Sequence, residues 1–501
     1  MKSQWVRGRT RLAVVLSISL TLAALGCGSG VQTGVLYTQN PLVALYNISV
    51  PGASQAWVEF GPTTSYGRQT SWSANLENDP NVLQVLVAGM KPSSTYHMRA
   101  HVVFPGGDTW VDRDHTFTTG PLPSGMTPPS IRVTQPTPGL SAAPGVELLC
   151  LVAPPGTNML ETVVTDLEGN IIWYYPYSTQ PIKPLPNGHF IVNVATDLLE
   201  IDLTGYTIRD VSVAQVNQSL QAMGRSFTVT DFSHDVLALP NGHWITIGQV
   251  TQNYTDLPGY PGTTAVVGDA VLDIDTTGNV AWAWSAFDYL NINRHLFGLP
   301  DWTHSNALVY TQDGNLLLSM RAQSWVLKLD YANGSGSGNI LWTLGEDGDL
   351  VLAGGDPSQW FYGQHYPNVL SEEGSQSIMA VYDDGNYRLN SSGVACGTTP
   401  SSPACYSRAT IFQVDESTNT ANLLWQNLPG FYSYWGGSIG LLSNGDVEFD
   451  NTTPAGAIAS QIMEVTPTEN SQTVWQMNIT GENAYRGYRI PSLYPGITWK
   501  Q

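Results

Sequence analysis

Leu185-Pro186-Asn187-Gly188 and Leu239-Pro240-Asn241-Gly242 are identical stretches 54 residues apart, and they decide the fold. Related turn sequences stand at 312–315, 371–374 and 442–445. An apolar run of the kind that forms a β-strand follows each turn. Asn-Gly and Asp-Gly supply the positive φ that a tight β-hairpin needs. The chain therefore repeats one strand–turn–strand unit.

The other half of the repeat is a strand ending in a polar residue, a turn, and a strand that usually carries Trp. Its copies are Asp166 with Trp173, Asp202 with Ile208, Asp275 with Trp282, Asp330 with Trp342, Asp415 with Trp425 and Thr466 with Trp475. These six copies are 60 residues apart on average, and four short strands in that length make a β-propeller blade. The sequence predicts an all-β chain with little helix and a six-bladed β-propeller over 145–501.

A smaller β unit precedes the propeller. Residues 31–120 hold short β runs separated by Gly and Pro turns, which favours a small β-sandwich. The strand start Pro92-Ser93-Ser94-Thr95-Tyr96 and the closing Phe117-Thr118-Thr119 resemble a fibronectin type III module. That resemblance implies a shape and no chemistry. Residues 121–144 are rich in Pro and are predicted to be a linker.

Composition excludes several classes of protein. The 501 residues carry 40 acidic and 20 basic side chains, a net charge of −20, and this acidic balance repels nucleic acid. Charged residues are only 12%, which is too few for a coiled coil. Hydrophobic residues reach 42%, enough to build a core and exclude a disordered chain.

The N-terminus is a targeting segment. Basic residues at positions 2, 7, 9 and 11 precede an uncharged apolar stretch, and residues 1–26 are predicted to be a signal peptide. Ala24-Leu25-Gly26-Cys27 resembles a bacterial lipobox, in which Cys27 would be lipidated; plain cleavage is the alternative. We expect an exported protein of the periplasm or cell envelope, attached to a membrane only through such an anchor.

The remaining cysteines fit an oxidising compartment. Cys396 and Cys405 flank a turn-rich segment, so we expect them to form a disulfide in a surface loop whose loss leaves catalysis intact. Cys150 lies in an apolar strand and is predicted to be a buried, inert thiol.

Three of the nine histidines stand out by their phase. His234, His304 and His365 precede the hairpin turns of three successive repeats by seven to nine residues, which places them at the start of the innermost strands. His189 and His243 follow the turns directly and are predicted to be structural. Arg321 lies one strand after His304, and the planar fork of its guanidinium matches a tetrahedral oxyanion.

The histidines have two alternative interpretations. Three histidines can bind zinc, but a cation such as Arg321 beside a metal is unfavourable without an anion between them. The second interpretation is drift of the repeat, with polar residues tolerated in a water-filled channel. Three histidines and one arginine fit an anion-binding, group-transfer site better, and no metal is assigned.

Six motifs, in this order and spacing, resemble the bacterial aryl-sulfate sulfotransferase family. They are Ser233-His234-Asp235-Val236, His304-Ser305-Asn306, Ser319-Met320-Arg321, Gln364-His365, Asp383-Asp384-Gly385-Asn386 and the closing Tyr488-Arg489-Ile490-Pro491-Ser492-Leu493-Tyr494-Pro495. The resemblance implies a six-bladed propeller behind a small sandwich. It also implies transfer of a sulfuryl group from an aryl sulfate to a phenol without phosphoadenylyl sulfate or another cofactor.

By this resemblance, His365 carries the sulfuryl group, and His234, His304, Asn306 and Arg321 bind the sulfate. The segment Trp435-Gly436-Gly437-Ser438 matches nothing in the family, which leaves the acceptor open. Two other functions are weighed: a non-catalytic cell-surface propeller that binds sugar or protein, and a quinone-dependent dehydrogenase. The sequence leaves the oligomeric state open, a homodimer among the options.

Overall fold

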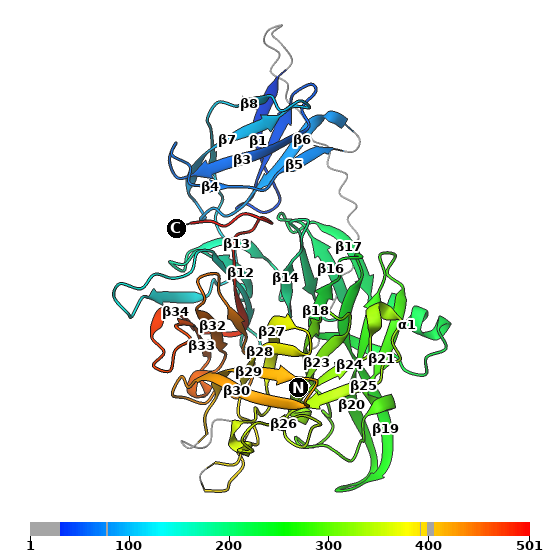
Figure 1. The fold of residues 1–501 in the computed structure, drawn as a ribbon. Coiled ribbons are helices and arrows are strands. Elements are labelled where there is room, and N and C mark those ends of the chain that lie inside the picture. The colour runs from blue at the N-terminus through cyan, green and yellow to red at the C-terminus, as the bar shows by residue number, and fades with distance from the viewer. Residues whose placement is uncertain (1–30, 77–78, 391, 398–404, 501) are drawn as a thin grey trace.

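The computed structural model describes residues 31–500 except 77–78, 391 and 398–404. The predicted signal peptide and Cys27 lie outside the described residues. The fold is almost entirely β, as predicted, and its sheets are dominated by antiparallel pairs (Figure 1).

The first group of strands contains residues 32–118 and stands at one end of the molecule (Figure 1). In the described part of the chain it is a nine-stranded arrangement of β1 (Gln32–Tyr37), β2 (Ala44–Ser49), β3 (Gln55–Gly61), β4 (Arg68–Gln69), β5 (Ser73–Leu76), β6 (Asp79–Val87), β7 (Thr95–Val103), β8 (Thr109–Val111) and β9 (His115–Thr118). Strands β2 and β7 alternate buried and less buried side chains, because one face of each strand packs on the core.

Three further sheets are four-stranded meanders in chain order. The described residues form β14 (Ile182–Pro184), β15 (Phe190–Asn193), β16 (Asp197–Ile201) and β17 (Thr207–Ser212); β18 (Val229–Ala238), β19 (Trp244–Leu257), β20 (Tyr260–Ile274) and β21 (Val280–Ser285); and β22 (Ser305–Tyr310), β23 (Leu316–Met320), β24 (Trp325–Leu329) and β25 (Ile340–Leu344). Strands β19 and β20 extend as a long hairpin beyond the rest of their sheet (Figure 1).

The last three sheets in the described chain combine strands that lie far apart in sequence. One holds β27 (His365–Glu373), β28 (Gln376–Asp383), β29 (Arg408–Asp415), β30 (Thr420–Asn427) and the parallel β26 (Val351–Leu352). The next holds β31 (Ile439–Leu441), β32 (Val447–Asn451), β33 (Ala459–Val465), β34 (Thr473–Thr480) and β10 (Ser130–Thr134). The third holds β11 (Val146–Val152), β12 (Thr162–Thr165), β13 (Ile171–Tyr175) and the C-terminal β35 (Asn483–Ile490).

Strand β10 lies inside the segment 121–144 that was predicted to be a linker. Its pairing with β34 runs from Ser130↔Thr480 to Thr134↔Gln476. The segment therefore supplies an outer strand to a sheet formed by residues 439–480. The alternating Ile131-Arg132-Val133 is the sequence signal for this strand, and it is obscured by the prolines on both sides.

Helices are short in the described chain. They are α1 (Val213–Ala222), α2 (Ala286–Tyr289) and the 3-10 turns η1 (Arg321–Gln323), η2 (Ala332–Gly334), η3 (Pro357–Gln359) and η4 (Pro454–Gly456). The side chain of Ser212 caps α1 by accepting a hydrogen bond from the backbone N–H of Gln215. None of the described helices has the length and apolar character needed to cross a bilayer.

Apolar clusters fill the spaces between successive sheets. Trp173 stacks on Phe190, with ring centroids 5.0 Å apart, and joins the β11–β13 sheet to the β14–β17 sheet. Four further clusters join each following sheet to the next, through β31–β34. A sixth packs Trp475 and Met477 on Leu149, so that the last sheet contacts the one holding β11. The order of packing along the described chain is thus cyclic.

The hairpin turns adopt the backbone that the sequence predicts. Gly188, Gly242, Gly314, Gly374 and Gly445 all have φ between +60° and +88°. Residues other than glycine avoid positive φ because their Cβ clashes with the neighbouring carbonyl oxygen. Glycine at these turns therefore sets the register of each pair of strands.

Candidate active site

Three neighbouring strands bring the predicted histidines together. His234 lies within β18, His304 directly precedes β22 and His365 is the first residue of β27, and β22 contacts both β18 and β27. The rings of His234 and His304 are 4.8 Å apart, and Tyr485 of β35 contacts the rings of both His234 and His365. The three histidine side chains therefore lie close together, as their spacing predicts.

The three histidines are not at strictly equivalent positions. His234 and His304 have φ of +52° and +46°, but in the third strand the corresponding left-handed residue is Tyr366, with φ +48°. His365 itself pairs with Tyr382 before the bulge that follows it. The bulge therefore gives His365 a different backbone setting from the other two histidines.

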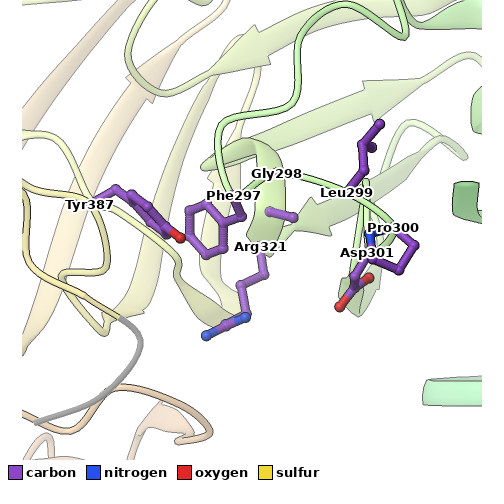
Figure 2. Close-up of a pocket in the computed structure, with 8 residues that line it drawn as sticks. Phe297, Gly298, Leu299, Pro300, Asp301, Arg321 and Tyr387 are labelled. Carbon is purple, nitrogen blue, oxygen red and sulfur yellow. The ribbon is translucent and has the colours of Figure 1, made fainter. Parts of the chain in front are cut away.

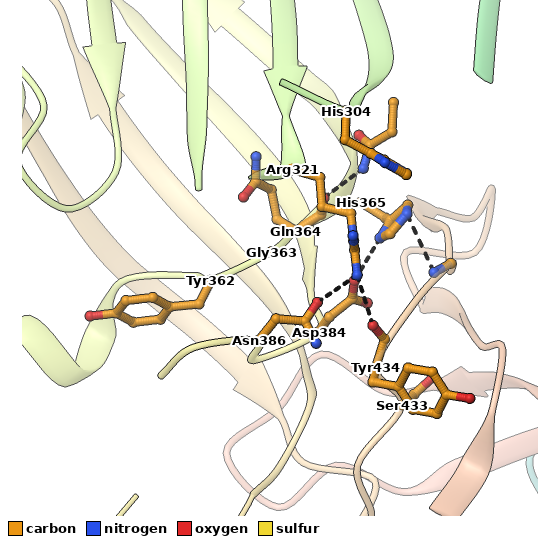
Figure 3. A network of polar contacts seen from close by, with 12 residues as sticks. His304, Arg321, Tyr362, Gly363, Gln364, His365, Asp384, Asn386, Ser433 and Tyr434 are labelled. Atoms are coloured by element: carbon orange, nitrogen blue, oxygen red, sulfur yellow. Dashed lines mark hydrogen bonds and ion pairs between the residues drawn. The ribbon is translucent and has the colours of Figure 1, made fainter. Parts of the chain in front are cut away.

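His365 is held by hydrogen bonds at both ring nitrogens (Figure 3). Its Nδ1 lies 2.6 Å from Oδ2 of the fully buried Asp384, and its Nε2 accepts a hydrogen bond from the backbone N–H of Gly436 at 3.3 Å. Since the Nε2 acceptor must be unprotonated, the proton is on Nδ1 and points at the carboxylate. Burial, reinforced by Arg321, lowers the pKa of His365 well below its usual value. The imidazole is therefore neutral near pH 7, with a lone pair on Nε2.

Arg321 approaches Asp384 from the side. Its Nη2 donates to Oδ1 of Asn386 at 3.0 Å and to the backbone carbonyl of Tyr434 at 3.1 Å, and its Nε lies 3.8 Å from Oδ2 of Asp384 (Figure 3). Within the described part of the chain the buried Nε has no hydrogen-bond partner. A fixed guanidinium with donor capacity to spare suits a tetrahedral oxyanion.

Asn306 supports the strand that carries His365. It is fully buried, and its Nδ2 donates to the backbone carbonyl of Gln364 at 2.7 Å. Its Oδ1 has no partner among the described residues. Gln364 in turn donates to Ser319 and to the Trp325 carbonyl. One amide N–H of Asn306 is thus committed to the scaffold of the site.

His304 and His234 differ in their partners. Nδ1 of His304 pairs with Oδ2 of Asp301 at 2.5 Å. Burial alone would raise the pKa of Asp301, but the hydrogen bond from His304 keeps this pKa below its ordinary value. His234 Nδ1 contacts the hydroxyl of Ser233, and burial together with His304 lowers the pKa of His234 well below its usual value. Two further imidazoles therefore border the site.

A buried ion cluster lies behind His234. Asp235 is fully buried and pairs with Lys183 at 2.5 Å and with Arg486 at 3.3 Å. Burial alone would raise its pKa, but these two cations hold the pKa of Asp235 below its ordinary value. Arg486 also donates to the backbone carbonyl of Asn306. The cluster ties β14, β18, β22 and β35 together beneath the histidines.

Three groups of the site were not assigned a role from sequence: Asp384, Asn386 and the backbone of Gly436. Asp383-Asp384-Gly385-Asn386 is one of the family-like motifs, but nothing in its spacing shows that its second acid reaches His365. Gly436 belongs to the segment that matched no family feature, and a Cβ there would lie 2.3 Å from Oγ1 of Thr452. The contact of Gly436 with His365 could not be predicted from the sequence, because it joins two sheets.

Other histidines serve the scaffold. His189 pairs with Glu200 at 2.6 Å and His243 with Asp273 at 2.8 Å, each across one sheet, as the structural interpretation predicts. In the described residues no group of three or more His, Cys, Asp or Glu side chains is arranged to hold a metal ion.

The predicted disulfide between Cys396 and Cys405 is present, and residues 392–395, which lead into it, are exposed. Both cysteines are buried and pack against Tyr432. The Tyr432 hydroxyl donates to the Gly397 carbonyl and accepts from Nδ2 of Asn386, the residue that holds Arg321. Because Tyr432 links the disulfide to Asn386, we expect loss of the disulfide to impair catalysis, contrary to the expectation from the sequence.

The double variant Cys396→Ser with Cys405→Ser should lose about 2–3 kcal/mol of stability, the scale for a short closed loop. It should also raise the KM for an anionic donor, because Tyr432 and Asn386 lose their support. Thermal melting and steady-state kinetics measure both. Reductant should reproduce these changes in the wild-type protein and add nothing in the double variant; unchanged KM in both cases would show that the disulfide supports only its own loop.

These features define a class: an all-β protein in which a histidine held by an aspartate, two further histidines and an arginine lie together. The chain belongs to the arylsulfotransferase (ASST) family, whose model matches residues 141–489. All the histidines and the arginine of the site fall within that match. Family membership implies sulfotransferase activity on substrates of the aryl sulfate and phenol kind.

Other comparisons are remote. No curated protein matches the chain. A Bacteroides caccae protein of unknown function is 12% identical with a TM-score of 0.41, over 69% of this chain and 98% of that one. A streptogramin B lyase is 10% identical with a TM-score of 0.30, over 70% and 98%. A cobalt-substituted Synechocystis ACO is 12% identical with a TM-score of 0.30, over 89% and 96%. No functional inference rests on these three.

Proposed function

We propose that the protein transfers a sulfuryl group from an aryl sulfate to a phenol by a ping-pong reaction, with His365 as the covalent carrier. The observation that supports this best is the pairing of His365 Nδ1 with the buried Asp384 at 2.6 Å. It leaves the Nε2 lone pair as the nucleophile and places the carboxyl of Asp384 where the ring becomes cationic. Burial raises the pKa of Asp384 well above its usual value, and Arg321 beside it opposes that shift. Arg321 stands beside this pair.

In the first half-reaction, Nε2 of His365 forms a bond to sulfur as the bond from sulfur to the aryl oxygen breaks. The electron pair of the broken bond leaves with the phenolate. By analogy with phosphoryl transfer, the transition state is loose, with charge on the peripheral oxygens. Arg321 opposes that charge, and His234, His304 and Asn306 donate hydrogen bonds to it. The sulfated imidazolium keeps its proton on Nδ1, where it is hydrogen-bonded to Asp384.

In the second half-reaction, the oxygen of the acceptor phenol bonds to sulfur as the bond from sulfur to Nε2 breaks, and the lone pair returns to His365. The acceptor loses the one proton that the departed phenolate gains. His304, oriented by Asp301, is placed to carry that proton. The same site serves donor and acceptor in turn.

Incubation with 4-nitrophenyl sulfate, with and without a second phenol, tests the proposal. Transfer predicts nitrophenol release that depends on the acceptor, together with a sulfated acceptor of the expected mass. Release into water alone would indicate a sulfatase, and no release would favour the non-catalytic binding protein.

Arg321→Lys should reduce transfer by at least about 10²-fold, the scale for losing one oxyanion donor. Lysine keeps the charge but lacks the planar fork that lets Nη2 bond Asn386 and Tyr434 while Nε stays free for the substrate. Steady-state kinetics with 4-nitrophenyl sulfate measure the loss. Arg132→Lys, on the exposed part of the outer strand β10, is the matched control and should behave as wild type. Near wild-type turnover of Arg321→Lys would show that the guanidinium does not contact the sulfate.

We also propose that the six sheets are the blades of a six-bladed β-propeller over 145–501, behind a fibronectin-like sandwich at 31–120. The cyclic order of the apolar clusters and the pairing of β35 with β11 support this arrangement. Export and lipidation at Cys27 complete the proposal. An experimental structure tests the blade count, and mass spectrometry of the mature N-terminus tests the lipid.

A further inference from the structure

A pocket of about 260 Å³ opens beside Arg321. Its lining consists of Phe297, Gly298, Leu299, Pro300, Asp301, Arg321, Ala322 and Tyr387 (Figure 2). Asp301 is the residue that holds His304, so two walls of this pocket are formed by groups that also belong to the histidine site. The pocket therefore adjoins the position proposed for the sulfate.

A pair of aromatic rings lies beside the arginine. The ring centroids of Phe297 and Tyr387 are 4.3 Å apart at an interplanar angle of 39°, and Cζ of Arg321 lies 5.3 Å from the Phe297 centroid (Figure 2). Both rings are only half-buried. They come from segments about 90 residues apart in the printed sequence, before β22 and after β28. A pair of partly open rings beside a cation is a surface on which a further ring can pack.

The wall that carries Phe297 is anchored to the long β19–β20 hairpin. The N–H of Leu299 donates to the Tyr260 hydroxyl at 2.9 Å, and the N–H of Val267 donates to the Pro300 carbonyl at 2.7 Å. The N–H of Trp302 donates back to Val267 at 2.9 Å. These bonds hold the loop in place before a ligand arrives, which reduces the entropy lost on binding.

The segment that carries Tyr387 is equally constrained. Tyr387 has φ +64°, an unusual backbone for a side chain of this size, and its N–H donates to the Cys396 carbonyl at 2.7 Å. Its neighbours are fixed as well, since Asn386 bonds Arg321 and Arg388 bonds the Tyr406 carbonyl. Non-glycine residues with positive φ persist where the surroundings enforce them, and they concentrate at binding sites.

We propose that this pocket is the subsite for the aryl ring of donor and acceptor, with Phe297 and Tyr387 packing on the ring while its oxygen points to Arg321. The inference rests on the proposed function and adds where the ring binds. The volume is below the range of drug-sized pockets, about 300–1,000 Å³, so the subsite fits a small, single-ring aryl group. Alkyl sulfates fill the pocket without presenting a ring face, so they should be poor donors.

The test compares Phe297→Leu, which keeps apolar volume but loses the ring, with Phe297→Tyr, which keeps it. Loss of one aromatic contact predicts a rise in KM for 4-nitrophenyl sulfate of roughly 5- to 10-fold in Phe297→Leu, with Phe297→Tyr close to wild type. Tyr387→Leu and Tyr387→Phe should show the same contrast. Tyr206→Leu, at a tyrosine 61% exposed on a distant turn, is the matched control and should change nothing.

Competitive inhibition by inorganic sulfate separates the ring from the anion. If the rings bind the aryl group, the inhibition constant for sulfate stays at the wild-type value in both leucine variants. If sulfate weakens as much as the aryl donor, Phe297 acts only by placing Arg321, and the subsite is wrong. An unchanged KM for the donor in both leucine variants overturns it as well.

The wild-type protein distinguishes this failure from failure of the proposed function. A wild type that transfers sulfate while its leucine variants keep the donor KM contradicts the subsite alone. A wild type that neither transfers nor hydrolyses 4-nitrophenyl sulfate contradicts the proposed function, and with it the subsite.

Discussion

His365→Asn is expected to abolish sulfuryl transfer, with a loss of at least about 10⁴-fold, the scale for removing a covalent nucleophile. Asparagine keeps a polar side chain of similar reach but offers no lone pair of comparable basicity to sulfur. Incubation of wild type with donor alone, followed by peptide mapping, should place an added sulfuryl mass on the peptide that holds His365. That adduct should be labile in acid and stable in alkali, as an N–S bond of the phosphoramidate type would be.

Two comparisons make this result specific. His234→Asn should retain the adduct but form it more slowly, since it removes a contact to the sulfate and leaves the nucleophile. His243→Asn removes a histidine that also pairs with an aspartate, but outside the site, and should behave as wild type. Label found on His304 or on a tyrosine, or turnover by His365→Asn, would show that the carrier has been misassigned.

Asp384→Asn should reduce turnover by about 10³- to 10⁴-fold while the KM for the donor changes little, as when the carboxylate that orients a catalytic imidazole is neutralised. The amide cannot take on the negative charge with which the carboxyl stabilises the sulfated imidazolium. It can also donate to Nδ1 and so favour the tautomer with the proton on Nε2, where the lone pair is needed. Rapid mixing with donor alone should show slow formation of the adduct.

Asp301→Asn is the matched comparison, because it alters the second His–Asp pair of the site. The carboxylate of Asp301 is 54% exposed and that of Asp384 is fully buried, so solvent can replace part of what Asp301 provides. We expect a loss of about 10-fold, on the order of one general acid–base contact weakened but not removed. Equal effects of the two substitutions, or a melting temperature lowered only in Asp384→Asn, would indicate that Asp384 acts through folding.

Much of the site could be predicted from local patterns. Spacing to the hairpin turns placed His234, His304 and His365 at the start of neighbouring strands, because a repeated turn sets the register of each unit. The disulfide pairing also followed from spacing. The burial of the two cysteines against Tyr432 did not, because it depends on a residue that lies outside the loop.

The three histidines do not occupy strictly equivalent positions in their strands, for a related reason. The turns are 7, 9 and 8 residues away, and bulges absorb these differences in different places. Hydrogen bonding in β27 begins at His365 and the left-handed residue comes after it, at Tyr366. A pattern of residue types does not record where a strand places its extra residue.

By itself, the sequence determined the class of fold, the strand repeat and the side chains available for chemistry. These depend on properties of neighbouring residues: the alternation of apolar side chains, the positive φ of glycine in turns, and the residue types that bind an oxyanion. Tertiary structure alone decided that Asp384 orients His365, that Asn386 and Tyr434 fix Arg321, and that Gly436 approaches Nε2. It also brought Phe297 to Tyr387. Each of these contacts joins separate strands or loops, and its geometry is set by how whole sheets pack.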